Sequence, residues 1–221
     1  MTAMQIAIDG PAGAGKSTTA KAVAKKLGYL YIDTGAMYRV VALMAIRKNV
    51  AFDDAEALAN LADSVDIELK QQGETYYVFA DGEDVSEAIR QPQVGNAAST
   101  ISAHPDVRRL LVEKQKAMAA KGKVIMDGRD IASVVMPDAE CKIFLTASLP
   151  VRAKRRQLEL EERGLPADLD AIEKEMEFRD EQDSSRAASP LKQTDDAILL
   201  DTSNLDFDQV VAEIIRLAGA E

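Results

Sequence analysis

Residues 10–17 read Gly-Pro-Ala-Gly-Ala-Gly-Lys-Ser and match the pattern G-x-x-x-x-G-K-[ST] at every fixed position. Glycines in such a loop let the backbone bend closely around anionic oxygens, toward which consecutive N–H groups point. In this pattern the lysine reaches the β- and γ-phosphates of a nucleotide, and the final hydroxyl binds Mg²⁺. The residues expected to hold a nucleotide polyphosphate are therefore Gly10, Pro11, Ala12, Gly13, Ala14, Gly15, Lys16, Ser17 and Thr18.

The segments on either side of this loop are of the kind that the pattern requires. Residues 4–9 form a short apolar run typical of a buried strand, and residues 17–27 have the composition of a helix. The loop would then lie at a helix N-terminus, where the helix dipole and the free N–H groups favour negative charge. A glycine-rich turn followed by a chance Lys-Ser is the alternative, and the agreement of loop and flanks disfavours it.

Composition excludes several classes of protein. The 221 residues include 27 Lys and Arg against 37 Asp and Glu, a formal net charge of −10. A nucleic-acid polymer as partner is disfavoured because binding one requires a broad basic surface. No apolar run approaches the roughly 20 residues that cross a bilayer, and the N-terminus lacks the pattern of a secretion signal. We expect a soluble, cytoplasmic monomer whose single Cys141 is a buried structural thiol.

Apolar strands alternate with helices along the chain. Strands are expected at residues 4–9, 29–32, 123–127, 141–145 and 197–200. Helices are expected at residues 17–27, 38–48, 105–121, 150–162, 170–187 and 207–217. Continuous apolar strands separated by helices are typical of a parallel sheet covered on both faces. The pattern predicts an α/β fold of the P-loop NTPase type, with a five-stranded parallel sheet flanked by helices.

One stretch interrupts this alternation. Residues 66–70 and 75–79 are rich in β-formers and flank the turn Gln71-Gln-Gly-Glu74, which predicts a small β-hairpin insert. A second turn is expected at Asp81-Gly82. We expect the insert's aromatic residues to form a small core of its own rather than a ligand-stacking surface; these are Tyr76, Tyr77 and Phe79.

Two polar segments follow predicted strands directly, as the loop at 10–17 does. The first is Asp33-Thr-Gly-Ala-Met-Tyr-Arg39, in which Thr34 is suited either to cap the next helix or to contact a ligand. Arg39 near the start of an apolar helix opposes the helix dipole, so unless it points to solvent it needs an anion. Because ligands bind beyond the carboxyl ends of parallel strands, we expect these segments to meet at one cleft.

The second polar segment is Asp127-Gly-Arg-Asp130. A carboxylate at the end of a buried strand, beside a phosphate loop, is a candidate to hold Mg²⁺ or its waters. Arg129 offers a planar fork suited to phosphate oxygens. Four polar residues directly after an apolar strand indicate a functional site rather than packing.

A helical stripe near the C-terminus changes character along its length. Ile172, Met176, Arg179, Asp183 and Arg186 follow the spacing of one helix face, which starts apolar and becomes charged. Such a stripe leaves the core and enters either water or a polar cleft. We favour the cleft because neighbouring residues already supply a solvated face; these are Asp180, Glu181, Ser184 and Ser185.

A group of arginines lies on the predicted helix at 150–162. Arg152, Arg155 and Arg156 precede the segment Glu161-Glu-Arg-Gly-Leu-Pro166. Arginines beside a segment bounded by glycine and proline suit a flap that closes over phosphates and excludes water. A solvated basic helix face explains them nearly as well, and the residues alone leave both interpretations open.

These motifs, together with Asn96-Ala-Ala-Ser99, resemble those of the bacterial cytidylate (CMP/dCMP) kinases, which are P-loop nucleoside monophosphate kinases. The resemblance runs along the whole chain, including the hairpin insert. It is most specific at Asp127–Asp130 and at the Arg-x-x-x-Asp-x-x-Arg helix ending at Arg186. It implies one kinase domain over residues 1–221, with a nucleoside-monophosphate-binding region at about 35–100 and a lid at about 150–166.

The resemblance also implies roles for individual residues. The acceptor phosphate would be held by Arg39, Arg129 and Arg186, the cytosine by Ser99, Arg108 and Asp130, and the sugar by Arg179 and Asp183. Arg155 and Arg156 would belong to the lid over ATP. We place the catalytic work on Lys16, Arg129, Arg155 and Arg186, further substrate contacts on Thr34 and Asp127, and the metal on Ser17 and Asp127.

The implied reaction is in-line transfer of the ATP γ-phosphoryl group to CMP or dCMP, a step of pyrimidine metabolism that uses Mg²⁺. A kinase for another small acceptor such as UMP or AMP is the alternative within the same class. A P-loop GTPase switch is a different class. It is disfavoured because the sequence has no Asn/Thr-Lys-x-Asp run to read guanine and because the arginine cluster would stay unexplained.

Overall fold

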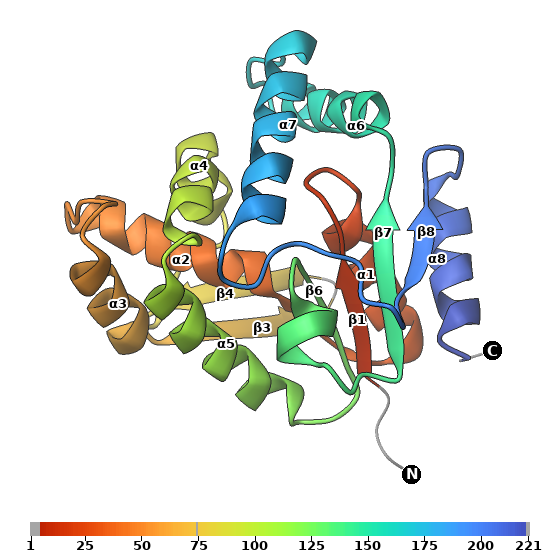
Figure 1. Ribbon diagram of the computed structural model, residues 1–221, viewed down its shortest axis with the longest axis horizontal. Coiled ribbons are helices and arrows are strands. Elements are labelled where there is room, and N and C mark those ends of the chain that lie inside the picture. The colour runs from red at the N-terminus through yellow and green to blue at the C-terminus, as the bar shows by residue number, and fades with distance from the viewer. Residues whose placement is uncertain (1–4, 74, 220–221) are drawn as a thin grey trace. The chain divides into compact units, whose positions relative to one another are not determined.

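The computed structural model of the chain describes residues 5–73 and 75–219. These residues fold into two compact units, coloured by position along the chain in Figure 1. The first unit contains the chain up to Tyr31 and again from Gly122, and the second contains Ile32–Lys121. The predicted nucleoside-monophosphate-binding region at 35–100 lies within the second unit.

A five-stranded sheet forms the centre of the first unit. Its strands are β1 (Gln5–Asp9), β2 (Leu30–Asp33), β6 (Val124–Gly128), β7 (Cys141–Thr146) and β8 (Ile198–Asp201). They lie in the order β2-β6-β1-β7-β8, and β1 pairs in parallel with both of its neighbours. The central strands carry fully buried isoleucines, which are Ile6, Ile8, Ile125 and Ile143. The predicted parallel sheet is confirmed.

Four helices and one short helical turn complete the first unit. The elements are α1 (Lys16–Leu27), the turn η2 (Ile131–Val135), α6 (Leu149–Glu162), α7 (Leu169–Ser185) and α8 (Phe207–Leu217). Helices α1 and α8 pack against each other, as do α6 and α7, which lie side by side in Figure 1. Ala153 and Leu160 of α6 meet Ile172 and Met176 of α7 in a small apolar cluster. The apolar half of the predicted stripe on α7 is therefore buried.

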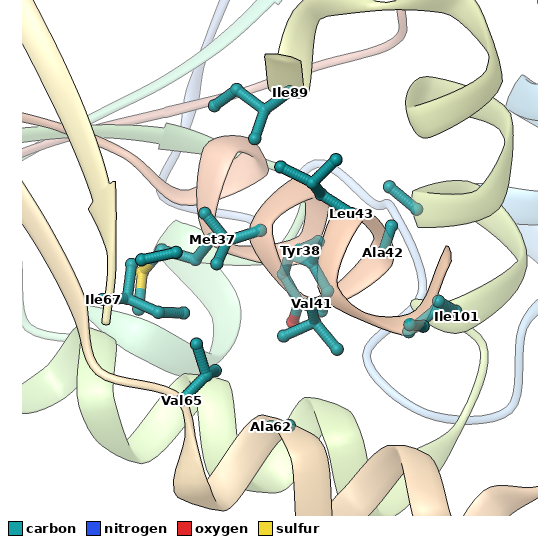
Figure 2. Packing of buried hydrophobic residues seen from close by; sticks show 14 of the residues in the cluster. Met37, Tyr38, Val41, Ala42, Leu43, Ala62, Val65, Ile67, Ile89 and Ile101 are labelled. Carbon is teal, nitrogen blue, oxygen red and sulfur yellow. The ribbon is translucent and has the colours of Figure 1, made fainter. Parts of the chain in front are cut away.

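The second unit is built around α2. Its elements are α2 (Thr34–Arg47), α3 (Ala55–Ser64), β3 (Ile67–Gln72), β4 (Thr75–Ala80), β5 (Glu83–Asp84), the turn η1 (Ala88–Arg90), α4 (Pro92–Ile101) and α5 (Pro105–Ala119). Helix α2 contacts α3, α4, α5 and η1, which is why it is apolar on most of its surface. Figure 2 shows Met37, Val41 and Leu43 of α2 among side chains that include Ile67 and Ile101.

The predicted hairpin is present, with a different distribution of its aromatic residues. Strands β3 and β4 pair antiparallel, and a turn at Asp81 and Gly82 with positive φ at both residues leads into β5. Val78 and Ala80 are buried in the core, whereas Tyr77 and Phe79 lie on the other face, half-buried. Alternation along β4 thus turns Tyr77 and Phe79 away from the buried core, where their rings contact each other with centroids 6.3 Å apart, while half-buried Tyr76 lies on the face of Val78 and Ala80.

The start of α2 also differs from the expectation. The helix begins at Thr34 rather than at Tyr38, and its N-cap is Asp33, whose carboxylate accepts the N–H of Ala36. The cap role considered for Thr34 is therefore wrong, and Thr34 itself is buried in the first turn. Among the described residues, no helix is long and apolar enough to cross a membrane.

The last helix tests how much one cap contributes. Asp206 and Gln209 form a reciprocal capping box at the start of α8. We expect Asp206→Ala to lower the free energy of unfolding by about 1 kcal/mol, because it leaves the N–H of Gln209 without its acceptor. Chemical denaturation measures this loss. The control is Asp208→Ala in the same turn, which should cost only a few tenths of a kcal/mol through the helix dipole; equal losses in both variants would contradict the cap.

Candidate active site

The loop between β1 and α1 has a backbone that only glycine allows at its first position. Gly10 has φ of +152°, and a Cβ atom there would lie 1.9 Å from the carbonyl oxygen of Leu145. At the other end, Gly15 caps α1 in the left-handed region with φ of +90°. The loop is therefore held against β7 and delivers its chain directly into the first turn of α1, where N–H groups are free to bind an anion.

Lys16 is the buried cation of this loop. Its ammonium group donates to the carbonyl oxygen of Pro11 at 2.7 Å, and 6% of the residue is exposed. Burial, with the positive charge of Arg129, lowers the pKa of Lys16 to about 7 from its usual 10.5, although Asp127 and Asp183 oppose the shift. A buried ammonium with so low a pKa is stabilised by a nearby anion.

Ser17, Tyr31 and Asp127 form a hydrogen-bonded group next to Lys16. The Ser17 hydroxyl donates to one carboxylate oxygen of Asp127 at 2.7 Å, and the Tyr31 hydroxyl donates to the other at 2.7 Å. Asp127 lies at the end of β6, beside β1, so the predicted meeting of the loop at 10–17 with Asp127–Asp130 is confirmed. Tyr31 was missed, because nothing in the sequence shows that β2 lies next to β6.

The oxygen atoms of Ser17 and Asp127 fit Mg²⁺. This ion prefers hard oxygen ligands and commonly takes one or two from the protein, with water and phosphate completing its shell. A hydroxyl and a carboxylate already in contact are such a pair. Over the described ranges, no group of three acidic, histidine or cysteine residues forms a metal site of its own. An ion here would need the phosphates of a bound nucleotide.

Arg129, Asp183 and Arg186 form an ion cluster between the loop after β6 and the end of α7. Arg129 Nε donates to one carboxylate oxygen of Asp183 at 2.7 Å, and Arg186 Nη1 donates to the other at 3.2 Å. Burial opposes ionisation of Asp183, but both arginines keep its pKa below the usual range. Two members of the charged end of the stripe are thus largely shielded from water: the Asp183 side chain is 13% exposed and that of Arg186 is 8% exposed.

Asp9 is a site residue that sequence reasoning missed. Its carboxylate accepts the backbone N–H groups of Ile131 and Ala132 at 2.9 and 2.8 Å, which fixes the chain just after Asp130. Burial raises the pKa of Asp9 to about 6, against the effect of these two hydrogen bonds. The available signal was an acidic residue at the end of an apolar strand, directly before Gly10.

Arg152 and Asp180 also differ from the expectation. Arg152 is buried rather than part of a solvated basic face, and it donates to the carbonyl oxygen of Ala12 at 2.8 Å. Asp180 pairs with Arg152 at 2.7 Å and accepts the N–H of Ala12 at 3.2 Å, so placing it on the solvated face was wrong. Both backbone groups of Ala12, a predicted nucleotide contact, are therefore bound by protein side chains.

The two arginines predicted for the lid have different surroundings. Arg155 donates to the hydroxyl and the carbonyl oxygen of Thr202, at 3.0 and 2.8 Å. Arg156 pairs with Glu159 one turn along α6. Arg155 also lies close to the phosphate loop, since its Nη1 is 4.0 Å from where a Cβ atom on Gly15 would lie.

The remaining predicted residues of the first unit are dispersed around these groups. Arg179 pairs with Glu175 at 3.7 Å along α7, one turn before Asp183. Asp130 is buried next to η2, and its negative charge contributes to the raised pKa of Asp9. Thr18 is exposed on α1, whereas Ala14 is buried in the loop.

Four predicted residues lie in the second unit: Arg39, Ser99, Arg108 and Thr34, which is buried in the first turn of α2. Arg108 on α5 is buried, donates to the carbonyl oxygen of Ser102 at 3.1 Å and lies over the ring of Tyr38. Ser99 is half-buried on α4. Arg39 is half-buried on α2 and forms no hydrogen bond or ion pair with another residue of the described ranges. A half-buried guanidinium in this state suits an anionic ligand.

Comparison with known proteins gives a family match over almost the whole chain. The model of the cytidylate kinase family matches residues 6–220. A cytidylate kinase of Geobacillus sp. (strain WCH70) is 50% identical over 216 residues, which are 98% of this chain and 96% of that protein. A cytidylate kinase of Lactobacillus johnsonii is 53% identical over 214 residues, which are 97% of this chain and 93% of that protein.

Solved structures share the fold at much lower identity. A gluconokinase of Sinorhizobium meliloti superposes with a TM-score of 0.53 at 12% identity, over 99% of this chain and 93% of the other. A shikimate kinase of Bacteroides thetaiotaomicron superposes with a TM-score of 0.50 at 16% identity, over 98% and 97% of the two chains. These likenesses concern the fold alone.

The low pKa of Lys16 is directly measurable. We expect side-chain NMR of the ligand-free protein, labelled at the lysine ε-carbons, to show one resonance that titrates near pH 7, and we expect Lys16→Met to remove it. The group is protonated below this pH and neutral above it, because burial disfavours the charged form. If no lysine resonance titrated near pH 7, the burial of Lys16 would be wrong.

Proposed function

The chain belongs to the cytidylate kinase family, and from this premise we propose that it transfers the γ-phosphoryl group of ATP directly to the phosphate of CMP or dCMP. One observation carries the proposal: the buried Lys16 lies in the field of Arg129, Asp127 and Asp183. A phosphate loop whose buried lysine lies within electrostatic reach of an arginine cluster suits a reaction in which two anions must approach.

The phosphate loop is proposed to bind ATP. Lys16 and the free N–H groups at the start of α1 would neutralise the β- and γ-phosphates, which lowers the energy of the charge that develops during transfer. Lys16 keeps a fixed position because its ammonium donates to Pro11. Lys16 must be protonated for this role. The negative charge of the bound ATP phosphates would raise the pKa of Lys16 and so favour the protonated form.

Ser17 and Asp127 are the proposed holders of Mg²⁺. When bound, the ion neutralises phosphate charge and helps to align the transferring group. The contribution of the chain is to keep the hydroxyl and the carboxylate together, with Tyr31 donating to the oxygen of Asp127 that Ser17 does not use.

The acceptor needs charge neutralisation rather than a general base. A phosphate monoester has a second pKa near ~6, so it is largely dianionic at neutral pH and already nucleophilic. Arg129 and Arg186 are proposed to grip this phosphate, with Asp183 holding both guanidinium groups in place. The planar fork of arginine binds phosphate oxygens in pairs, which fixes the direction of attack. The family resemblance implies the same role for Arg39.

The remaining roles follow from the family resemblance. Ser99, Arg108 and Asp130 are proposed to read the cytosine, Arg179 and Asp183 to contact the sugar, and Thr34 to contact the substrate. We also propose that α6, with Arg155 and Arg156, belongs to a lid that excludes water from the transferring group. A monomeric state and a location in the cytoplasm stay predictions.

Two alternatives differ in what they leave unexplained. A kinase for UMP or AMP keeps the same phosphate chemistry and changes only the residues that read the base. A GTPase switch leaves the Arg129–Asp183–Arg186 cluster without a role, so the kinase explains more of the site.

A coupled assay of ADP release tests the proposal. With Mg-ATP as donor, we expect turnover of CMP and dCMP to exceed that of UMP, AMP and GMP. Lys16→Ala should abolish turnover, because it removes the cation on the phosphates, and this variant controls for contaminating kinases. A preference for another acceptor would overturn the assignment of the base as cytosine. If no monophosphate were turned over, the proposed kinase activity itself would be refuted.

Variants of the arginine cluster test the acceptor site. We expect Arg129→Ala and Arg186→Ala each to raise the KM for CMP by about tenfold or more while changing the KM for ATP little, since each removes a charge-assisted contact. Arg216→Ala is the control, because Arg216 lies exposed on α8, where it pairs with Glu213 of the same helix. An unchanged KM for CMP in both cluster variants would remove these arginines from the acceptor site.

A further inference from the structure

Arg152 joins three parts of the first unit through one guanidinium group. Nε donates to the carbonyl oxygen of Ala147 after β7 at 2.9 Å. Nη1 donates to the carbonyl oxygen of Ala12 in the phosphate loop at 2.8 Å and lies 2.7 Å from the carboxylate of Asp180 on α7. The Arg152 side chain is 8% exposed, so these contacts are shielded from water.

Asp180 holds the same loop residue from the other side. One carboxylate oxygen accepts the N–H of Ala12 at 3.2 Å while the other pairs with Arg152. The peptide groups on both sides of Ala12 are thereby fixed by one ion pair. This N–H is also directed at a protein carboxylate, so it is not one of the donors that meet phosphate.

The next loop residue packs against the same two helices. A Cβ atom on Gly13 would lie 2.7 Å from the terminal methyl group of Met176 on α7 and 3.2 Å from Cβ of Arg152 on α6. Ala12 and Gly13 therefore rest on α6, the helix of the proposed lid, and on α7. The orientation of the loop depends on this support as well as on β1 and α1.

The position of the Asp180 carboxylate is unexpected, because it lies next to a loop that is proposed to bind a polyanion. A negative charge at hydrogen-bonding distance from the loop backbone opposes the binding of phosphates, unless a cation compensates for it. Arg152 supplies that cation in contact with both the carboxylate and the loop. An ion pair shielded from water that loses one partner leaves an uncompensated charge, which is destabilising.

We propose that Arg152 and Asp180 are positioning residues for ATP: the pair orients the phosphate loop at Ala12, and Arg152 neutralises the carboxylate that would otherwise repel the polyphosphate. This inference rests on the proposed function for the identity of the ligand. It differs from the roles assigned above, since neither side chain needs to touch the nucleotide.

The signature of such a pair is rescue by a second substitution. We expect Arg152→Met to weaken Mg-ATP binding about tenfold or more because it leaves Asp180 charged and unpaired beside the loop. Asp180→Asn alone should weaken it only about threefold, since the amide oxygen still accepts the N–H of Ala12. The double variant should bind within about threefold of Asp180→Asn, because the repelling charge is gone.

Calorimetric titration of Mg-ATP and, separately, of CMP into the full-length chain measures these effects. CMP affinity should change by less than about twofold in all three variants, since the Arg129–Asp183–Arg186 cluster is intact. Glu181→Gln is the matched control, because Glu181 is the exposed neighbour of Asp180 on α7 and should bind both ligands as the unaltered protein does. Thermal unfolding of each variant shows that it is folded.

Each outcome of these titrations supports or overturns the proposal. A double variant that binds Mg-ATP as weakly as Arg152→Met, or equal losses for ATP and CMP, would reduce the pair to a packing role and overturn the proposal. If Arg152→Met does not fold, Arg152→Lys tests the same point: it keeps the charge opposite Asp180 and should retain most of the affinity. An unaltered protein that binds Mg-ATP but does not phosphorylate CMP would refute the proposed function, whereas this inference would still be tested by binding.

Discussion

The buried ammonium of Lys16 is the constraint on which the first unit depends. A shielded cation is costly unless anions surround it, and here Asp9, Asp127 and Asp183 oppose the lowering of its pKa while Arg129 adds to it. The ends of two parallel strands and one helix bring these charges together. These carboxylates do not fully offset the effect of burial on the pKa of Lys16, and a bound polyphosphate would stabilise the charged form further.

Carboxylates in this unit hold cations and backbone in place rather than act as bases. Asp183 orients Arg129 and Arg186, Asp180 orients Arg152, and Asp9 fixes the chain after Asp130. This explains how a chain with a net charge of −10 presents a site for anions. Positive groups gather locally at the ends of strands and helices, and acidic partners keep them in fixed positions, which suits a reaction that depends on alignment and charge.

The elements that sequence reasoning predicted correctly carry strong local signals. The parallel sheet followed from continuous apolar strands, and the hairpin followed from β-formers around a turn. The loop at 10–17 and its contact with Asp127 followed from a motif and from strand topology. The errors lay where the signal was not local: Asp180 and Arg152 look like ordinary residues of solvated helix faces, and only the packing of α6 and α7 against Ala12 buries them.

The sequence by itself determined the fold class, the phosphate loop and the arginine-rich character of the site. These features depend on apolar periodicity and on motifs whose residues lie close together in the sequence, so both signals are local. The tertiary structure alone decided which charges face each other: Arg129 with Asp183, Asp9 with the chain after Asp130, and Arg152 with Asp180 and Ala12. The partners are 54 or more residues apart along the chain except for Arg152 and Asp180, so their contacts arise from the packing of separate elements and have no signature in local sequence.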